Sequence, residues 1–515
     1  MNGMRELNRD FGFPWQPDDG RGGYANPILF ADYSDPDVIR VGDDFWMTAS
    51  SFNCTPALPI LHSRDLVNWS LVGHAVKNLP DPSYSQVRAG CGVWTPAIRF
   101  HAGRYWIFFP MPDEGIYVVT APDPRGPWTD PHLLQAGIGL IDPCPLWDDD
   151  GRAYLIFAYA DSRTGVKHKL DVREMDPAAR HLIGPPHTIF NDPVNHPTAE
   201  GPKFYKRGGW YYVFAPAGGV ATGWQLALRS RHVLGPYEHR IVLAQGNTPI
   251  NGPHQGALVH TPVGENWFIH FQELLPYGRI VHLQPVTWTD GWPLIGRRSG
   301  QTHIGEPVQT DRKPVVLTDP PCAPASSDRF DSADATSGEL AKQWQWHANH
   351  QLEWSSLTAR PGWLRLRAMP VHPTDLSLTP HLLLQKFPAA SFQLQTRIQL
   401  ATPDTGGGIV VIGLDSAALL LHRRANGNEV SLHIGDQKSS LASVTTDSID
   451  LRVTVQNGGK CSFACRTEAD WIQSPQIFQA KEGKWIGAKI GLLAAAESSG
   501  RFADFQYFQF APAGR

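Results

Sequence analysis

Three carboxylic acids, Asp35, Asp142 and Glu200, hold matching places in a sequence that repeats. Each stands directly before a proline or a Gly-Pro pair, at the start of a segment that continues as two apolar strands. If these starts converge in space, one carboxyl can stay protonated to assist a leaving oxygen. A second can activate water, and a third can set the proton affinity of the acid. This division of labour is the chemistry of glycoside hydrolysis.

The elements that would position these acids are repeated hairpins. Five segments carry a proline near their start, at positions 36, 96, 143, 202 and 253, and continue as strand, tight turn and aromatic strand. The turns are rich in Gly, Asp and Asn, which tolerate positive φ. A period of about 50 residues with four strands per unit is typical of a β-propeller. We therefore expect five blades, with every repeat start close to the central axis.

The chain as a whole is predicted to be all-β, with four parts. They are an N-terminal extension (1–24), the five-bladed propeller (25–305), a linker rich in Pro, Ser and Asp (306–328) and an antiparallel β-sandwich (329–515). The last part has many short strands without the 50-residue period, as a sandwich does. Within it, GELAKQWQW (338–346) is the one short helical candidate.

Composition excludes several classes of function. The 515 residues carry a formal net charge of −4 and 18% charged residues, so no basic excess exists to bind nucleic acid or an anionic membrane. No apolar run reaches the length of a membrane span, and the N-terminus lacks the apolar core of a signal peptide. Six cysteines without a CxxC pair are interpreted as mostly buried free thiols. A cytoplasmic location is expected (periplasmic or secreted if a leader was removed), and a homo-oligomer is left open.

Aromatic and basic side chains near the repeat starts are candidates for sugar binding. Phe52 and Trp94 each lie a short step from a repeat start and could offer flat faces to sugar rings. The alternative is packing in the core, because blades press large side chains together. Arg279 follows the fifth hairpin, where it could bind sugar hydroxyls, pair with a carboxylate or lie on the surface.

The motifs together resemble a known family. The match begins with NPILFADYSDPDVIRVGDDFWMTASSFNCTPALPILHSRDLVNW (26–69) and continues through GVWTPAIRF, IDPCPLWDDDGRAYLIF, TAEGPKFYKRGGWYYVF, NGPHQGALV and GRIVHLQPVTW. It resembles glycoside hydrolase family 43 over about residues 26–300, in the family's order of motifs. The C-terminal part looks like the β-sandwich appended to β-xylosidase-like members.

The resemblance implies a role for each candidate. Asp35 matches the general base, Glu200 the general acid, and Asp142 the third acid that tunes Glu200 and holds the substrate. Asp37, in the same SDPD motif, is the competing choice for the base. Members of the family invert anomeric configuration. Three residues match positions that line the sugar subsite: Phe52, Trp94 and Arg279.

His254, in GPHQG, resembles a histidine near the propeller axis that holds a calcium ion through water in several members. Calcium prefers oxygen ligands, so a hydrogen-bonding axial histidine is the alternative. We expect no cofactor to be required for the chemistry, with a structural Ca2+ near the axis as an option.

The predicted function is an exo-acting, inverting glycoside hydrolase. It would release a terminal pentose, β-D-xylose and/or α-L-arabinofuranose, from xylo-oligosaccharides or arabinoxylan fragments. The alternatives are a non-catalytic carbohydrate-binding propeller and a protein-interaction propeller. Neither requires three carboxylates at the repeat starts.

Overall fold

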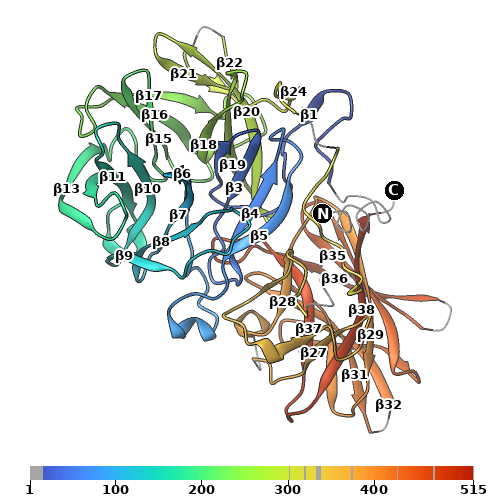
Figure 1. Ribbon diagram of the computed structural model, residues 1–515. Coiled ribbons are helices and arrows are strands. Elements are labelled where there is room, and N and C mark those ends of the chain that lie inside the picture. The colour runs from blue at the N-terminus through green and yellow to red at the C-terminus, as the bar shows by residue number, and fades with distance from the viewer. Residues whose placement is uncertain are drawn as a thin grey trace.

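The computed structural model describes residues 15–300, 302–317, 320–331, 338–372, 375–425, 427–467 and 470–513. Over these residues the chain forms two all-β parts that lie against each other (Figure 1). The propeller is at the upper left of the view and the sandwich at the lower right. The predicted fold class, a five-bladed β-propeller followed by an antiparallel β-sandwich, is confirmed.

Each blade is an antiparallel sheet of four strands that follow one another in the sequence. Blade 1 comprises β2 (Asp37–Val41), β3 (Asp44–Thr48), β4 (Ala57–Ser63) and β5 (Ser70–Val76). Blade 2 comprises β6 (Ala97–His101), β7 (Arg104–Met111), β8 (Gly115–Ala121) and β9 (His132–Ala136). Blade 3 comprises β10 (Leu140–Trp147), β11 (Ala153–Tyr159), β12 (Lys169–Met175) and β13 (Leu182–Asn191).

The last two blades complete the ring. Blade 4 comprises β14 (Lys203–Arg207), β15 (Trp210–Ala217), β16 (Trp224–Ser230) and β17 (Glu238–Ala244), with β22 (Arg297–Arg298) and β23 (Gly305–Glu306) added at its edge. Blade 5 comprises β18 (His254–His260), β19 (Asn266–Leu274), β20 (Gly278–Thr289) and β21 (Trp292–Ile295). A separate pair joins β1 (Gly23–Ala25) to β24 (Thr310–Arg312).

Apolar side chains on both faces of each blade hold the ring together. In β3, Phe45 and Met47 join the core between blades 1 and 5, while Trp46 joins the core between blades 1 and 2. In β7, Ile107 faces blade 1 and Phe108 faces blade 3. Successive side chains of a strand point to opposite faces, and both faces of a blade are covered. This is why the second strand of each hairpin is a continuous apolar run.

The segment before the first blade closes the ring against the last blade. The backbone of Leu29 exchanges two hydrogen bonds with Val281 in β20, at 3.3 and 3.0 Å. The residues that follow, up to Asp35, therefore reach the axis from blade 5 before they enter β2.

The C-terminal sandwich packs two seven-stranded sheets around one core. The first contains β25 (Gln345–Trp346), β28 (Leu383–Lys386), β37 (Lys489–Ala495), β30 (Thr405–Ile412), β31 (Ser416–Arg424), β32 (Gly427–Ile434) and β33 (Gln437–Val444). The second contains β26 (Ser355–Ser356), β27 (Leu364–Arg367), β38 (Phe502–Pro512), β29 (Phe392–Leu400), β34 (Ser448–Gln456), β35 (Lys460–Arg466) and β36 (Trp471–Gln479).

The helix predicted within residues 338–346 was wrong. This segment is irregular and ends in the strand β25. Trp344 and Trp346 are both buried, and the indole N–H of Trp344 donates to Asp328 at 2.8 Å. The alternation in QWQW is the two-residue period of a strand, and it outweighs the helix propensity of the preceding residues.

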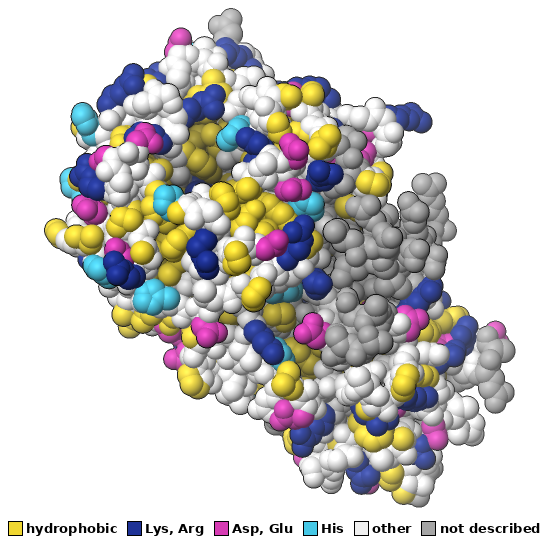
Figure 2. Space-filling view, in the orientation of Figure 1, with side chains coloured by type: hydrophobic (Ala, Val, Ile, Leu, Met, Phe, Trp, Pro, Cys, Tyr) yellow, Lys and Arg dark blue, Asp and Glu magenta, His cyan; other side chains and the backbone are white. Residues whose placement is uncertain are grey.

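Helical turns are short wherever the chain is described. They are η1 (Pro82–Ser85), α2 (Asp161–Thr164), η2 (Leu352–Trp354) and η3 (Leu376–Leu378). Among the described residues, no helix has the length and apolar character needed to cross a membrane. On the face shown in Figure 2, acidic and basic side chains are interspersed without a broad area of one sign.

Backbone and side-chain hydrogen bonds join the two domains next to the propeller axis. Thr55 and Trp346 exchange two backbone hydrogen bonds, at 2.6 and 3.0 Å. The side chains of Asn53 and Thr55 donate to the carbonyl groups of His347 and Ala348, at 2.8 and 2.6 Å. The sandwich thus supports the loop after β3, which carries Phe52.

Candidate active site

A cavity of about 190 Å³ opens at the propeller axis, and the six residues predicted for chemistry and sugar binding all line it. They are Asp35, Asp142, Glu200, Phe52, Trp94 and Arg279. Residues from five separate stretches of sequence thus meet in one pocket, as expected if the repeat starts converge.

Asp35 lies just before β2 and is surrounded by hydrogen-bond donors. Its carboxylate accepts hydrogen bonds from the hydroxyl groups of Ser50 (2.6 Å) and Ser34 (3.0 Å). The Nη1 atom of Arg279 lies 3.0 and 3.2 Å from its two oxygens. Arg279 thus takes the carboxylate-pairing alternative. The arrangement suits an ionised carboxylate that can accept a proton.

Asp37, the competing residue, faces elsewhere. It lies in β2 and accepts hydrogen bonds from the backbone N–H of Ile98 and from Arg99, both at 2.7 Å. It does not line the cavity among the described residues. Asp37 therefore ties blade 1 to blade 2, and Asp35 is the carboxylate of the motif that faces the pocket.

Asp142 is buried at the start of blade 3, with φ of 56°. It accepts a hydrogen bond from the backbone N–H of Gly201 at 2.7 Å and a longer one from Gln255 at 3.4 Å. The hydroxyl of Thr95 donates to the amide oxygen of Gln255 at 3.0 Å and fixes its orientation. Burial and the neighbouring Glu200 raise the pKa of Asp142 to about 7.

Glu200 lies between blades 3 and 4 and is the most open of the three acids. Its side chain is 20% exposed, against 4% for Asp35. His254 Nε2 lies 3.0 Å from its Oε1 atom. Burial opposes ionisation of Glu200, but the hydrogen bond from His254 and the charges of Arg279 and Lys167 lower the pKa of the carboxyl. Two neighbouring carboxyls titrate as a pair, so Asp142 and Glu200 share one proton near neutral pH.

Phe52 and Trp94 form one wall of the pocket. Their rings lie 6.4 Å apart, and the backbones of Phe52 and Val93 form an isolated bridge between the two loops. Gly92 makes this bridge possible, because a Cβ atom there would lie 2.1 Å from the carbonyl oxygen of Phe52. The Trp94 indole donates to Gly90 at 3.0 Å, and Arg163 lies over its ring.

Trp485, from the sandwich, closes one side of the pocket and was missed by the sequence reasoning. Its ring lies 6.2 Å from that of Trp94, edge to face. The loop that carries it joins β36 to β37, and the backbone N–H of Gly487 donates to Asp32 at 2.9 Å. Lys167 was also missed, although it lines the cavity and its charge lowers the pKa of Glu200. Neither residue belongs to a repeated motif from which its position in the pocket could have been predicted.

Two places bear on metal binding. At the axis, His254 Nδ1 is buried and has no hydrogen-bond partner among the described residues. Away from the pocket, ligand atoms of Asp192, His196 and His239 lie within 4.8 Å of one another. The indole N–H of Trp224 donates to His196 Nδ1 at 3.2 Å. This bond places the ring proton on Nε2, which must lose it before that atom can bind a metal.

The family model for glycosyl hydrolases family 43 matches residues 24–293, and the model for the β-xylosidase C-terminal concanavalin A-like domain matches residues 327–511. The chain belongs to glycosyl hydrolases family 43. It is therefore a glycoside hydrolase, as predicted, and its substrates are oligosaccharides. The chemistry of this class of enzyme needs no cofactor in general.

Similar proteins cover nearly the whole chain. A relative from Xylanibacter ruminicola is 41% identical over 92% of this chain and 87% of its own length. A non-reducing-end α-L-arabinofuranosidase from Bacteroides ovatus is 30% identical over 95% of this chain and 94% of its own. The solved xylan β-1,4-xylosidase from Bacillus halodurans C-125 has a TM-score of 0.82 at 25% identity, covering 95% of this chain and 99% of its own.

Proposed function

We propose that this exo-acting glycoside hydrolase inverts configuration and releases a terminal pentose, β-D-xylose and/or α-L-arabinofuranose, from xylo-oligosaccharides or arabinoxylan fragments. The observation that carries the proposal is one pocket in which three carboxylates face a cavity of about 190 Å³. Trp485 closes one side of that cavity, which favours a chain end over a chain interior. The similarity to an α-L-arabinofuranosidase and to a xylan β-1,4-xylosidase supports the choice of sugar.

The proposed mechanism gives each of the three acids a different role. Glu200 gives its proton to the leaving glycosidic oxygen, while Asp35 takes a proton from a water that attacks the anomeric carbon from the opposite face. Asp142 shares the proton with Glu200 and orients the sugar. An inverting pair leaves room for this water, at a carboxyl separation of about 6.5–9.5 Å. Arg279 balances the charge of Asp35 until it accepts the proton.

The sugar is tested with nitrophenyl β-D-xyloside and nitrophenyl α-L-arabinofuranoside, assayed separately. We expect turnover of at least one, and proton NMR of the first-formed sugar should show inverted configuration. No turnover of either would overturn the substrate assignment. Retained configuration would overturn the mechanism but leave the substrate in place.

The roles of the acids are tested with Asp35→Ala and Glu200→Ala. General acid or base help is worth about 10²–10⁴-fold, so each variant should lose at least about a hundredfold in kcat. Glu200→Ala should lose much less on a dinitrophenyl glycoside, whose leaving group needs little acid help. The loss in kcat of Asp35→Ala should be as large on the dinitrophenyl glycoside as on the nitrophenyl glycoside. A non-catalytic binding propeller would instead bind xylo-oligosaccharides without turnover in the parent chain.

Ion binding near the axis, assembly into a homo-oligomer and a cytoplasmic location are further proposals. An ion held through water fits the buried Nδ1 atom of His254, which makes no hydrogen bond to any described residue. Calcium takes six to eight oxygen ligands, so water would supply most of them. We expect EDTA to lower the melting temperature and Ca2+ to restore it, with no effect expected if the site holds only water.

Light scattering would test whether the chain forms a homo-oligomer, and cell fractionation would test the cytoplasmic location.

A further inference from the structure

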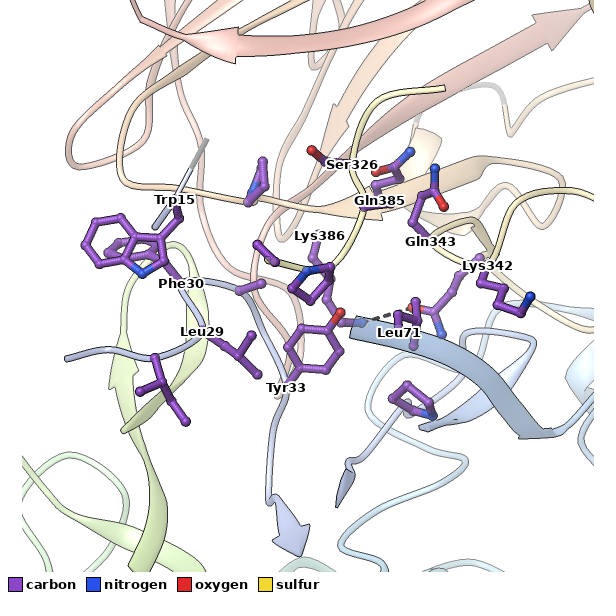
Figure 3. A pocket seen from close by; sticks show the side chains of 18 of the residues that line it. Trp15, Leu29, Phe30, Tyr33, Leu71, Ser326, Lys342, Gln343, Gln385 and Lys386 are labelled. Carbon is purple, nitrogen blue, oxygen red and sulfur yellow. Dashed lines mark hydrogen bonds between the residues drawn. The ribbon is translucent and has the colours of Figure 1, made fainter. Parts of the chain in front are cut away.

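A second cavity, of about 60 Å³, lies between the two domains (Figure 3). Its walls come from the segment before the first blade, the 323–326 stretch and the β28 strand of the sandwich. It shares no lining residue with the catalytic pocket, and no Asp or Glu is among the described residues that line it. The polar part of its wall therefore consists of amides, hydroxyls and amines, together with the imidazole of His74.

Two buried polar groups in this wall have no partner. Gln385 Nε2 and Ser326 Oγ belong to side chains that are each 4% exposed, and neither atom makes a hydrogen bond within the described part of the chain. Both side chains are drawn at the cavity in Figure 3. A buried donor without a partner destabilises the folded chain, because it has lost its hydrogen bond to water. Two such groups at one cavity indicate an occupant with hydrogen-bond acceptors.

A lysine supplies positive charge at the same cavity. Lys386 Nζ donates to the amide oxygen of Gln345 at 3.0 Å and lies over the Tyr33 ring at 5.3 Å. Burial and the neighbouring Lys489 ammonium lower the pKa of Lys386 to about 7. Lys342 also lines the cavity. No carboxylate in the described wall balances the charge of these lysines. An anionic ligand would supply the missing negative charge.

The remaining walls are apolar and the space is small. Leu29, Phe30 and Leu71 are among the apolar side chains that line it. One water-sized group needs about 10–15 Å³ of such a cavity, so 60 Å³ admits about four to six non-hydrogen atoms. A pentose ring with its hydroxyls exceeds this number. We propose that the cavity binds a short-chain carboxylate of two to four carbons, with its carboxylate on Gln385, Ser326 and Lys386 and its alkyl end on the apolar walls.

Binding at this place should stabilise the contact between the domains. The cavity wall includes Ala31 and Tyr33, and Asp32 between them accepts hydrogen bonds from the backbone of Arg279 and Gly487 at 3.0 and 2.9 Å. A ligand that binds only the folded chain raises its melting temperature by mass action.

The test measures binding of sodium propionate to the full chain by calorimetry and by melting temperature at constant ionic strength. We expect saturable binding at pH 6, and binding at least tenfold weaker for Gln385→Leu and Lys386→Met. The exposed Lys460→Met in β35 is the matched control and should bind like the parent. If Lys386→Met fails to fold, Ser326→Ala removes one donor and should weaken binding by a smaller factor.

Three further measurements distinguish the chemical class of the ligand. Acetate should bind, whereas neutral propionamide and inorganic phosphate should bind at least tenfold more weakly than propionate. Affinity should fall between pH 6 and pH 9 as Lys386 loses its proton, and Lys386→Met should abolish that dependence. The other titratable groups around this lysine are Lys342, Lys489, His74, Tyr33, Cys54 and Asp32. Absence of saturable propionate binding, equal binding of propionamide, or unchanged binding in Gln385→Leu and Lys386→Met would each overturn the proposal.

Discussion

At the residue scale, the proton shared by Asp142 and Glu200 sets the pH dependence. The pKa of Asp142 is raised to about 7, so the pair holds its proton below that pH and releases it above. We expect kcat/KM to fall as the pH rises through about 7. Asp142→Asn removes the negative charge that opposes ionisation of Glu200. The alkaline limb should then move to lower pH, measured on nitrophenyl xyloside or nitrophenyl arabinofuranoside, whichever is turned over.

The exposed acid Glu238, which pairs with Arg229 in blade 4, provides the control. Glu238→Gln removes a carboxylate outside the pocket, so its profile should match that of the parent. An unchanged alkaline limb in Asp142→Asn would contradict the shared proton and would assign the limb to another group.

At the scale of elements, the strand period and the 50-residue repeat predicted the positions of the three acids. The positions of residues on loops could not be predicted in this way. The apolar hairpins placed Asp35, Asp142 and Glu200 at one axis, because equivalent strands of a propeller take equivalent places. Ser50, which bonds Asp35, is one polar residue among many in the sequence. Trp485 belongs to a loop of another domain, and its position depends on a domain contact that no period encodes.

The loop that carries Trp485 makes a separate prediction. Contact between aromatic rings contributes about 0.5–1.5 kcal/mol, so Trp485→Ala should raise KM about two- to tenfold. The effect on kcat should be smaller, because among the described residues the Trp485 indole makes no hydrogen bond to an acid of the pocket. Trp363, stacked on Arg360 elsewhere in the sandwich, is the matched control. Equal changes in KM for both variants would mean that Trp485 acts only through the stability of the sandwich.

At the scale of the whole molecule, the domain contact should make the two domains unfold together. The bonds from Asn53 and Thr55 to the sandwich backbone lie next to Phe52, so the sandwich supports the pocket wall as well as closing it. Each such hydrogen bond contributes about 0.5–1.5 kcal/mol. We expect one calorimetric transition for the full chain, and two for the double variant Asn53→Ala/Thr55→Val.

That double variant should also raise KM, because the loop after β3 loses its support. Asn428→Ala removes a comparable bond, to Thr446 within the sandwich, and should lower the melting temperature without separating the transitions. Two transitions in the parent chain would show that the domains unfold independently.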